Sequence, residues 1–195
     1  MKFKKFKKDD PKWELVKDHP FCTDMPNPFL QVLYEHRRMI PNLKDISYFI
    51  ETGTYLGHSA SIFSECFDHV FTVEKEKNLY EAAKASYDNI AFILGDSGPF
   101  LKSMMIAWPD TRFVFLLDAH TGKETPILTE LAAIELSHRR DHVIIIDDTK
   151  DIDRKGSGWP NKTLFEAAIL GINPNYNIEY TPYGNRICIV YEEDI

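Results

Sequence analysis

The sequence predicts a single α/β domain: a doubly wound, mostly parallel seven-stranded sheet with an antiparallel last strand and helices on both faces. Three observations lead to this fold class. Strand-like runs of Val, Ile, Phe and Leu alternate with amphipathic segments between residues 48 and 170. Four of the first five runs end at an acid. The last two runs are joined by a connection too short to cross over between parallel strands.

The first helix is expected over 29–40, where apolar residues recur at helical spacing before Pro41. Five strand-like runs follow, at 48–51, 70–74, 90–94, 113–118 and 142–147. Helical segments separate or follow them at 57–67, 77–87, 98–108, 126–140 and 162–170. Strands that are apolar on both faces and alternate with helices are typical of a parallel sheet covered on both sides.

The carboxyl-terminal part breaks this alternation. The runs 177–181 and 186–193 are separated only by "PYGN". Because so short a link permits only antiparallel neighbours, the two runs should form a hairpin. This reversed ending distinguishes the chain from a simple dinucleotide dehydrogenase.

Length and composition indicate one globular domain. The 195 residues suffice for one core, and we divide the chain into a basic, irregular lead-in at 1–28 and a domain at 29–195. The net charge of −7 disfavours a broad nucleic-acid surface. Five lysines among the first eight residues could touch an anionic surface, but a solvated tail is the favoured interpretation.

The sequence favours a cytoplasmic protein. No apolar segment follows the first lysines as in a signal peptide, and no run approaches membrane-spanning length. The cysteines at 22, 66 and 188 form no C-x-x-C pair, so neither a zinc site nor a disulfide framework is expected. We therefore expect reduced thiols, with Cys66 and Cys188 in the core.

Acidic residues mark the ends of the predicted parallel strands. Glu51, Glu74, Asp118 and Asp147 end four of them, and Asp96 follows the fifth closely. Ligands of open α/β sheets bind beyond the carboxyl ends of the strands. Carboxylates gathered there are costly to bury without a partner, so the pattern predicts a ligand site.

A glycine turn follows the first strand in "ETGTYLGHSA". Gly53 and Gly57 would let the backbone approach a ligand and turn into the next helix, whose free amide groups can face an electronegative group. The spacing differs from the G-x-G-x-x-G dinucleotide motif and from a Walker motif. A turn of this kind also occurs for packing reasons alone.

Glu74 strengthens the ligand hypothesis because it ends the next strand. A carboxylate at this place can accept two hydrogen bonds from a ribose diol. The other interpretation is a surface acid that opens a helix beside Lys75 and Glu76. With the glycine turn nearby, we prefer the ribose interpretation.

Together, "FIETGTYLGHSA", "VFTVE", "ILGDS", "FLLDAH" and "IIIDD" resemble the motifs of class I S-adenosylmethionine-dependent methyltransferases, over about residues 45–192. The resemblance implies the Rossmann-like methyltransferase fold and this cofactor. Its first motif borders the methionine part of the cofactor, the acid of the second holds the ribose, and that of the third lies near the adenine. The implied cofactor-binding residues are Glu51, Thr52, Gly53, Thr54, Gly57, Glu74, Lys75, Asp96, Ser97 and Asp118.

"DAH" and "DD" also resemble the metal-binding positions of cation-dependent O-methyltransferases of the catechol and macrocin types. This resemblance implies Mg²⁺ at Asp118, Asp147 and Asp148, carboxylates of the kind that magnesium prefers. The other interpretation of the Asp pair is helix capping or an ion pair with Lys150 or Arg154.

The catalytic candidates are His120, as proton acceptor, and Asp118. A metal-ligand or wall role for His120 stays open, and a purely structural, hydrogen-bonded histidine is about as well supported. The polar segment 149–160 could close over a substrate or be an ordinary connection.

We therefore expect a methyltransferase that acts on a hydroxyl oxygen of a small acceptor, such as a sugar or secondary metabolite, with magnesium assistance as one version. The alternatives are a cation-independent enzyme with His120 as base, a noncatalytic cofactor-binding or assembly protein, and a nicotinamide oxidoreductase. The missing third glycine and the final hairpin weaken the last. The acceptor is not readable from the sequence, and a homo-oligomer stays open.

Overall fold

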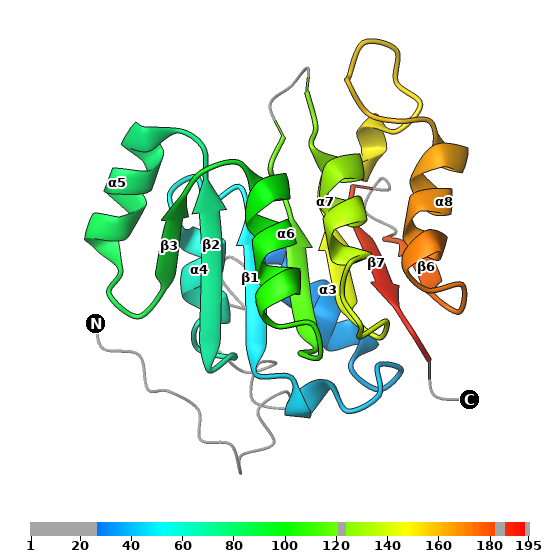
Figure 1. Ribbon diagram of the computed structural model, residues 1–195, viewed down its shortest axis with the longest axis horizontal. Helices are drawn as coiled ribbons and strands as arrows, with labels where there is room; N and C mark the ends of the chain where they lie inside the picture. Colours follow the sequence, from blue (N-terminus) through cyan, green and yellow to red (C-terminus); the bar gives the residue numbers. More distant parts are fainter. Residues whose placement is uncertain (1–26, 121–123, 182–185, 194–195) are drawn as a thin grey trace.

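The computed structural model of the chain describes residues 27–120, 124–181 and 186–193 (Figure 1). The expected basic tail and the "PYGN" link lie outside these residues. The strands are β1 Tyr48–Thr52, β2 His69–Glu74, β3 Ala91–Leu94, β4 Phe113–Leu117, β5 Val143–Ile146, β6 Asn177–Tyr180 and β7 Cys188–Tyr191. The α-helices are α3 Pro28–His36, α4 His58–Phe63, α5 Lys77–Ser86, α6 Ser97–Ala107, α7 Ile127–Ile134 and α8 Lys162–Ile172.

The strands form one seven-stranded sheet in the order β3-β2-β1-β4-β5-β7-β6. The neighbours from β3 to β5 pair in parallel, whereas β7 is antiparallel to both β5 and β6. In Figure 1, β7 runs downward between strands that run upward. The predicted fold class, with its reversed last strand, is confirmed.

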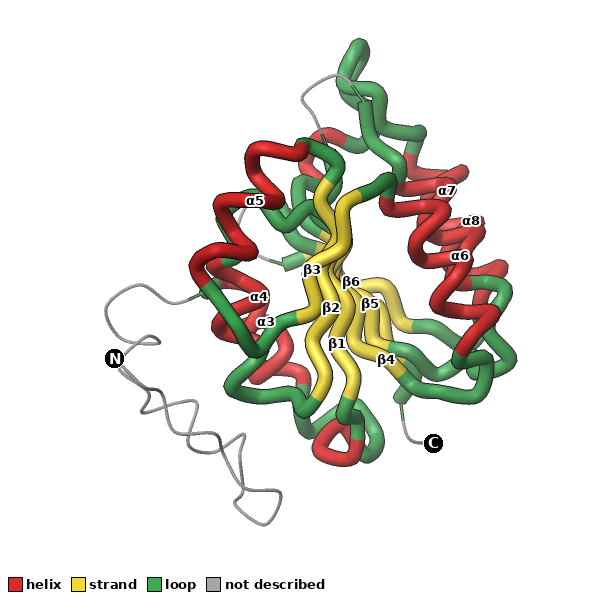
Figure 2. Tube along the Cα trace, turned by 60° about the vertical axis from the view of Figure 1, so that its left-hand side comes forward, coloured by secondary structure: helices red, strands yellow, loops and turns green. Residues whose placement is uncertain are grey.

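Helices cover both faces of the sheet (Figure 2). One layer contains α3, α4 and α5, and the other contains α6, α7 and α8. Successive side chains of a strand point to opposite faces. In β4, Val114 and Leu116 accordingly pack in the core under α3 and α4, while Phe113, Phe115 and Leu117 pack under the second layer. β4 and β5 are apolar throughout because both of their faces are buried.

Several helices end earlier than their apolar periodicity predicts. The expected helix 29–40 ends at His36, whose carbonyl accepts hydrogen bonds from the N–H groups of Met39 and Ile40 in a following turn. The expected helix 126–140 ends as α7 at Ile134. Ile40 is buried nonetheless, so the turn satisfies the same apolar pattern as a helix.

None of the helices in the described ranges combines the length and the apolar character that crossing a membrane requires.

Candidate active site

The acidic side chains that were predicted to share one edge of the sheet do lie at one edge. The strand registers align Thr52 of β1 with Val73 of β2 and Leu117 of β4, and align Leu117 with Ile146 of β5. Positions that end or follow these strands therefore meet at the carboxyl edge. We call five of them the acidic rim: Glu51, Glu74, Asp118, Asp147 and Asp148.

Glu51 is the buried centre of a short hydroxyl network. Only 2% of the residue is exposed, and Oε2 accepts a hydrogen bond of 2.6 Å from Oγ1 of Thr72. The hydroxyl of Thr54 lies 2.6 Å from that of Thr72. Burial raises the pKa of Glu51 to about 8, the bond from Thr72 opposes this rise, and the charge of Glu74 adds to it. A nearby cation would therefore favour the charged form of Glu51.

The turn after β1 depends on glycine. Gly53 and Gly57 have φ angles of +82° and +79°, a region that disfavours other residues. The N–H of Gly53 donates to the carbonyl of Val73 over 3.0 Å. A side chain at Gly53 would overlap the backbone of Asp118, and one at Gly57 would press on the ring of Tyr87. Packing against backbone thus requires glycine at position 53, while at position 57 the positive φ angle is the stronger reason. The predicted approach of both glycines to a ligand stays a prediction.

The side chain of Glu74 supports the same turn through a hydrogen bond. Its Oε2 accepts a hydrogen bond of 2.8 Å from the N–H of Tyr55, and its Oε1 accepts one of 2.8 Å from the N–H of Glu76, the N-cap residue of α5. The residue is buried, with 8% exposed, so it is not the surface acid of the alternative interpretation. A carboxylate accepts about four hydrogen bonds, which leaves capacity for a diol.

The predicted residues at the start of α6 have different environments. The Asp96 side chain is 67% exposed, with Oδ1 4.0 Å from Nζ of Lys75. Ser97 is buried, and its hydroxyl and that of Thr52, at the end of β1, lie close enough to the carboxyl of Glu130 in α7 to act against the rise of its pKa. Burial raises the pKa of Glu130 to about 7. This buried acid lies near Ser97 and Thr52, two of the predicted cofactor-binding residues. Sequence reasoning missed it because a single Glu in an apolar helix carries no local signal.

His120 lies between two carboxylates of the rim. Its Nδ1 is 3.5 Å from Oδ1 of Asp118, and its Nε2 contacts Oδ2 of Asp148. The ring of Trp159, from the segment between β5 and α8, packs 6.4 Å from the His120 ring and 6.1 Å from that of Phe165. The imidazole therefore faces two carboxyl groups and lies beside an aromatic ring.

Asp118 is an acid of the rim whose pKa is raised by burial and by its acidic neighbours. Burial, followed by repulsion from Asp147, Glu51 and Asp148, raises its pKa to about 8. Arg186 opposes this rise more weakly. The neutral carboxyl is thus populated at neutral pH, and a bound cation would favour the carboxylate.

Arg186 forms an ion pair with Asp147, a buried acid of the rim. Its Nε and Nη2 donate to Oδ1 and Oδ2 of Asp147 over 3.0 and 3.1 Å. Asp147 is 3% exposed. Arg186 also lies 3.6 Å from Oδ1 of Asp148, and Nζ of Lys150 lies 2.9 Å from the same oxygen. Partial burial acts to raise the pKa of Asp148, but Lys150 and His120 outweigh it and lower that pKa.

These contacts do not fit the predicted magnesium site. Across the described ranges, no three His, Cys, Asp or Glu side chains are grouped so that they could hold a metal ion. The physical reason is that Asp147 binds a guanidinium with both oxygens, while the two oxygens of Asp148 face Lys150 and His120. The structure instead has the ion pair with Lys150 that was the alternative interpretation of the Asp pair.

Sequence reasoning missed Arg186, although a signal existed. A strand antiparallel to β5 begins at the edge where β5 ends, and Ile146 pairs with Cys188. A residue just before the reversed strand must therefore lie beside one just after β5. The bond from the Thr149 N–H to the Arg186 carbonyl, 2.9 Å long, shows this proximity.

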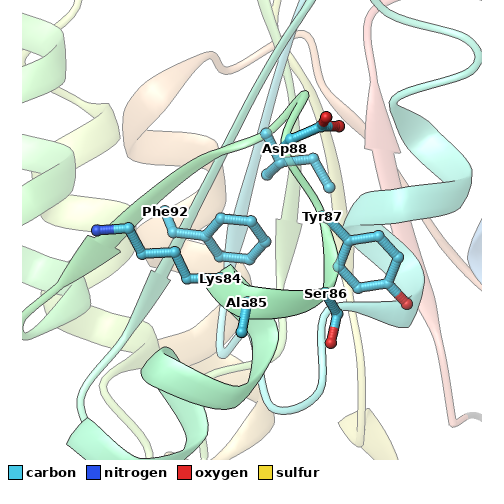
Figure 3. A pocket seen from close by; sticks show the side chains of 7 residues that line it. Lys84, Ala85, Ser86, Tyr87, Asp88 and Phe92 are labelled. Atoms are coloured by element: carbon cyan, nitrogen blue, oxygen red, sulfur yellow. The ribbon is translucent and has the colours of Figure 1, made fainter.

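A separate cavity of about 470 Å³ lies between the end of α5 and β3 (Figure 3). The side chains that line it are Lys84, Ala85, Ser86, Tyr87, Asp88, Ile90 and Phe92. None of the predicted site residues is among them. We place the candidate site at the rim because the titratable groups and the strand ends converge there.

Comparison with protein-family models finds no match, and comparison with curated proteins also finds none. Solved structures do match. A TehB-like S-adenosylmethionine-dependent methyltransferase from Corynebacterium glutamicum is 16% identical, with a TM-score of 0.51 over 76% of this chain and 82% of that one. The N-methyltransferase NodS from Bradyrhizobium japonicum is 10% identical, with a TM-score of 0.54 over 92% and 99%.

MycE, a methyltransferase of the mycinamycin biosynthetic pathway, is 13% identical to this chain with a TM-score of 0.62. The match covers 95% of this chain and 55% of MycE, so the chain spans about half the length of that protein. The fold is that of the class I S-adenosylmethionine-dependent methyltransferases. In this methyltransferase fold the acidic rim occupies the carboxyl edge, as the resemblance implied. Identities this low show the fold only, and they do not select the cation-dependent branch.

Proposed function

We propose that the protein transfers a methyl group from S-adenosylmethionine to a hydroxyl oxygen of a small acceptor, such as a sugar or secondary metabolite. One observation carries the proposal: Glu51 and Asp118 lie at the carboxyl edge of a methyltransferase fold, and their pKa values are raised to about 8. Glu51 hydrogen-bonds to the Thr72 hydroxyl. A ligand with sulfonium and ammonium groups would supply positive charge where these carboxyls need it.

The chain offers groups for each part of this cofactor. Glu74 would accept hydrogen bonds from the ribose hydroxyls, and the exposed Asp96, with Lys75 and Ser97 beside it, would face the adenine. The turn from Thr52 to Gly57 would lie along the methionine part. When bound, the cofactor supplies an activated methyl group that moves by direct displacement, so the protein's task is to orient the acceptor and exclude water.

His120 would accept the acceptor's proton. Its Nε2 contacts Asp148, which favours the tautomer with the proton on Nε2 and leaves the lone pair on Nδ1. The Trp159 ring lies beside this base, with 6.4 Å between the centroids of the two rings. MycE was solved in complex with Mg, SAH and mycinamycin VI. In this chain, Arg186 and Lys150 favour the version of the reaction without magnesium assistance, in which His120 is the base.

Calorimetry with S-adenosylhomocysteine tests the cofactor assignment. We expect Glu74→Ala to weaken binding at least about 10-fold, because it removes the ribose acceptor and the support of the Tyr55 N–H. Glu76→Ala is the matched control, because its side chain is exposed and its backbone N–H is retained. Failure of the wild type to bind at about 1 mM ligand would reject the proposal.

Methyl transfer to a panel of hydroxylated acceptors tests the reaction. Activity that persists in EDTA, and that falls by about 100-fold or more in His120→Ala, supports the metal-free reaction with His120 as base. Cofactor binding without transfer to any acceptor would instead favour the noncatalytic binding protein.

A further inference from the structure

We propose that Arg186 is a built-in counter-cation that takes the place of a divalent metal ion at the acidic rim, so that the rim accepts a metal only when this guanidinium is removed. The proposal concerns the protein without cofactor, and it holds whether or not the protein transfers methyl groups.

The first argument is geometric. A guanidinium matches a carboxylate as a planar fork, and Arg186 uses Nε and Nη2 to contact both oxygens of Asp147 at 3.0 and 3.1 Å. Asp147 is 3% exposed, and both of its carboxyl oxygens are engaged by this guanidinium. A metal ion bound by Asp147 would have to displace Arg186 from at least one oxygen.

The second argument is charge balance. Asp118, Asp147 and Asp148 follow the neighbouring strands β4 and β5, so three carboxyl groups share one edge of the sheet. Arg186 lies 3.6 Å from Oδ1 of Asp148 as well as against Asp147. One positive charge therefore acts on both carboxyl groups of the Asp pair, which would otherwise attract a cation. Lys150 and His120 add to it at Asp148.

The third argument is the origin of Arg186 in the fold. The residue precedes β7, the reversed strand, and its carbonyl accepts a hydrogen bond from the N–H of Thr149 directly after the Asp pair. The strand pairing of Ile146 with Cys188 fixes this approach. The cation is thus part of the sheet architecture, although 53% of its side chain remains exposed.

Titration with Mn²⁺ in the absence of cofactor tests the proposal, with bound metal detected by electron paramagnetic resonance. We expect no saturable binding by the wild type up to about 5 mM Mn²⁺. Arg186→Met keeps a long side chain and removes the charge, and it should bind one equivalent with a dissociation constant of about 0.1–1 mM. Arg186→Lys should resemble the wild type, because it keeps a positive charge near Asp147.

Two controls locate the effect. Arg154→Met removes an exposed partner of Asp151 and should create no site. Adding Asp147→Asn to Arg186→Met should abolish the new binding. Binding of Mn²⁺ by the wild type that Asp147→Asn removes would overturn the proposal, and so would a folded Arg186→Met variant that binds no metal.

Melting temperatures keep the test decisive if Arg186→Met is poorly stable. A ligand that binds only the folded state raises the melting temperature. Mn²⁺ should therefore stabilise Arg186→Met and leave the wild type unchanged. The reverse pattern, or stabilisation of both proteins alike, contradicts the proposal. These measurements need no cofactor, so their outcome is separate from that of the methyltransferase assignment.

Discussion

Gly53 lies directly against the backbone of Asp118: a Cβ atom at Gly53 would come within 2.4 Å of the Asp118 carbonyl oxygen. This contact fixes the distance between the turn after β1 and the segment after β4. The N–H of Asp118 also donates to the Thr52 carbonyl over 3.1 Å. Backbone packing at Gly53 therefore holds the end of β1, with Glu51, close to Asp118 after β4.

Gly53→Ala should destabilise the fold strongly, because the new Cβ would overlap backbone atoms that cannot move aside. Gly156→Ala is the matched control, since Gly156 has the same φ of +82° and open space around it. We expect a loss of about 1–2 kcal/mol for the control from its φ angle alone. Gly53→Ala should lose at least about 2 kcal/mol more in urea unfolding, by analogy with overpacked cores. Equal losses would show that the contact with Asp118 has no energetic weight.

Glu51→Gln should flatten the dependence of stability on pH. The folded-state pKa of Glu51 is raised from 4.5 to about 8, so its contribution is fully present below 4.5 and is lost as the pH rises through 8. The slope from one such group is at most about 1.4 kcal/mol per pH unit. Asp118 and Glu130 have raised pKa values too, so part of the slope should remain.

Urea unfolding of Glu51→Gln at several values between about pH 5 and pH 8 measures this slope. The exposed Glu76→Gln is the control and should match the wild type. An unchanged slope in Glu51→Gln would mean that Glu51 titrates as an ordinary acid.

His142→Gln should make the protein less sensitive to acid. His142 is fully buried, its Nδ1 accepts a hydrogen bond of 3.2 Å from the Phe113 N–H, and burial lowers its pKa from 6.5 to about 3. Its neutral form therefore contributes stability that is present above pH 6.5 and is lost as the pH falls toward 3. The variant should lose less stability over this range, although at pH 7 it is expected to be less stable by about 1–3 kcal/mol.

The control for this measurement is His138→Gln, because the His138 side chain is 72% exposed. Unfolding free energies between about pH 7 and pH 4 compare the three proteins. If His138→Gln and His142→Gln respond alike, burial of His142 is not the cause of acid sensitivity.

Trp159→Ala should affect the acceptor more than the cofactor, if the proposed function is right. The Trp159 ring lies beside His120, the proposed base, and beside Phe165. We expect a rise in KM for the acceptor of about 10-fold and little change in the affinity for S-adenosylhomocysteine. Leu164→Ala is the control, because this exposed side chain lies on the same part of the chain. A matching loss of cofactor affinity would contradict the assignment of Trp159 to the acceptor side.

The apolar pattern of the sequence predicted well those strands that are buried on both faces of the sheet. The runs that became β4 and β5 are apolar at every position because helices cover both faces. The same pattern overextended the helices at residues 37–40 and 135–140. At 37–40 a turn buries Ile40 as a helix would, whereas Leu136, in the second segment, is 47% exposed. Apolar periodicity indicates which residues face the core. It indicates less well whether the backbone between those residues continues as a helix or changes to a turn.

The candidate site divides in the same way. The alternation of strands and helices along the sequence was enough to place Glu51, Glu74 and Asp118 at one edge of the sheet, because parallel strands have their carboxyl ends at the same edge. Only the tertiary structure decided which charges meet there. Asp147 and Arg186 are 39 residues apart, and the pairing of a reversed strand with β5 brings them into contact. Local sequence governs where a side chain emerges from an element, whereas its electrostatic partner depends on contacts between distant elements.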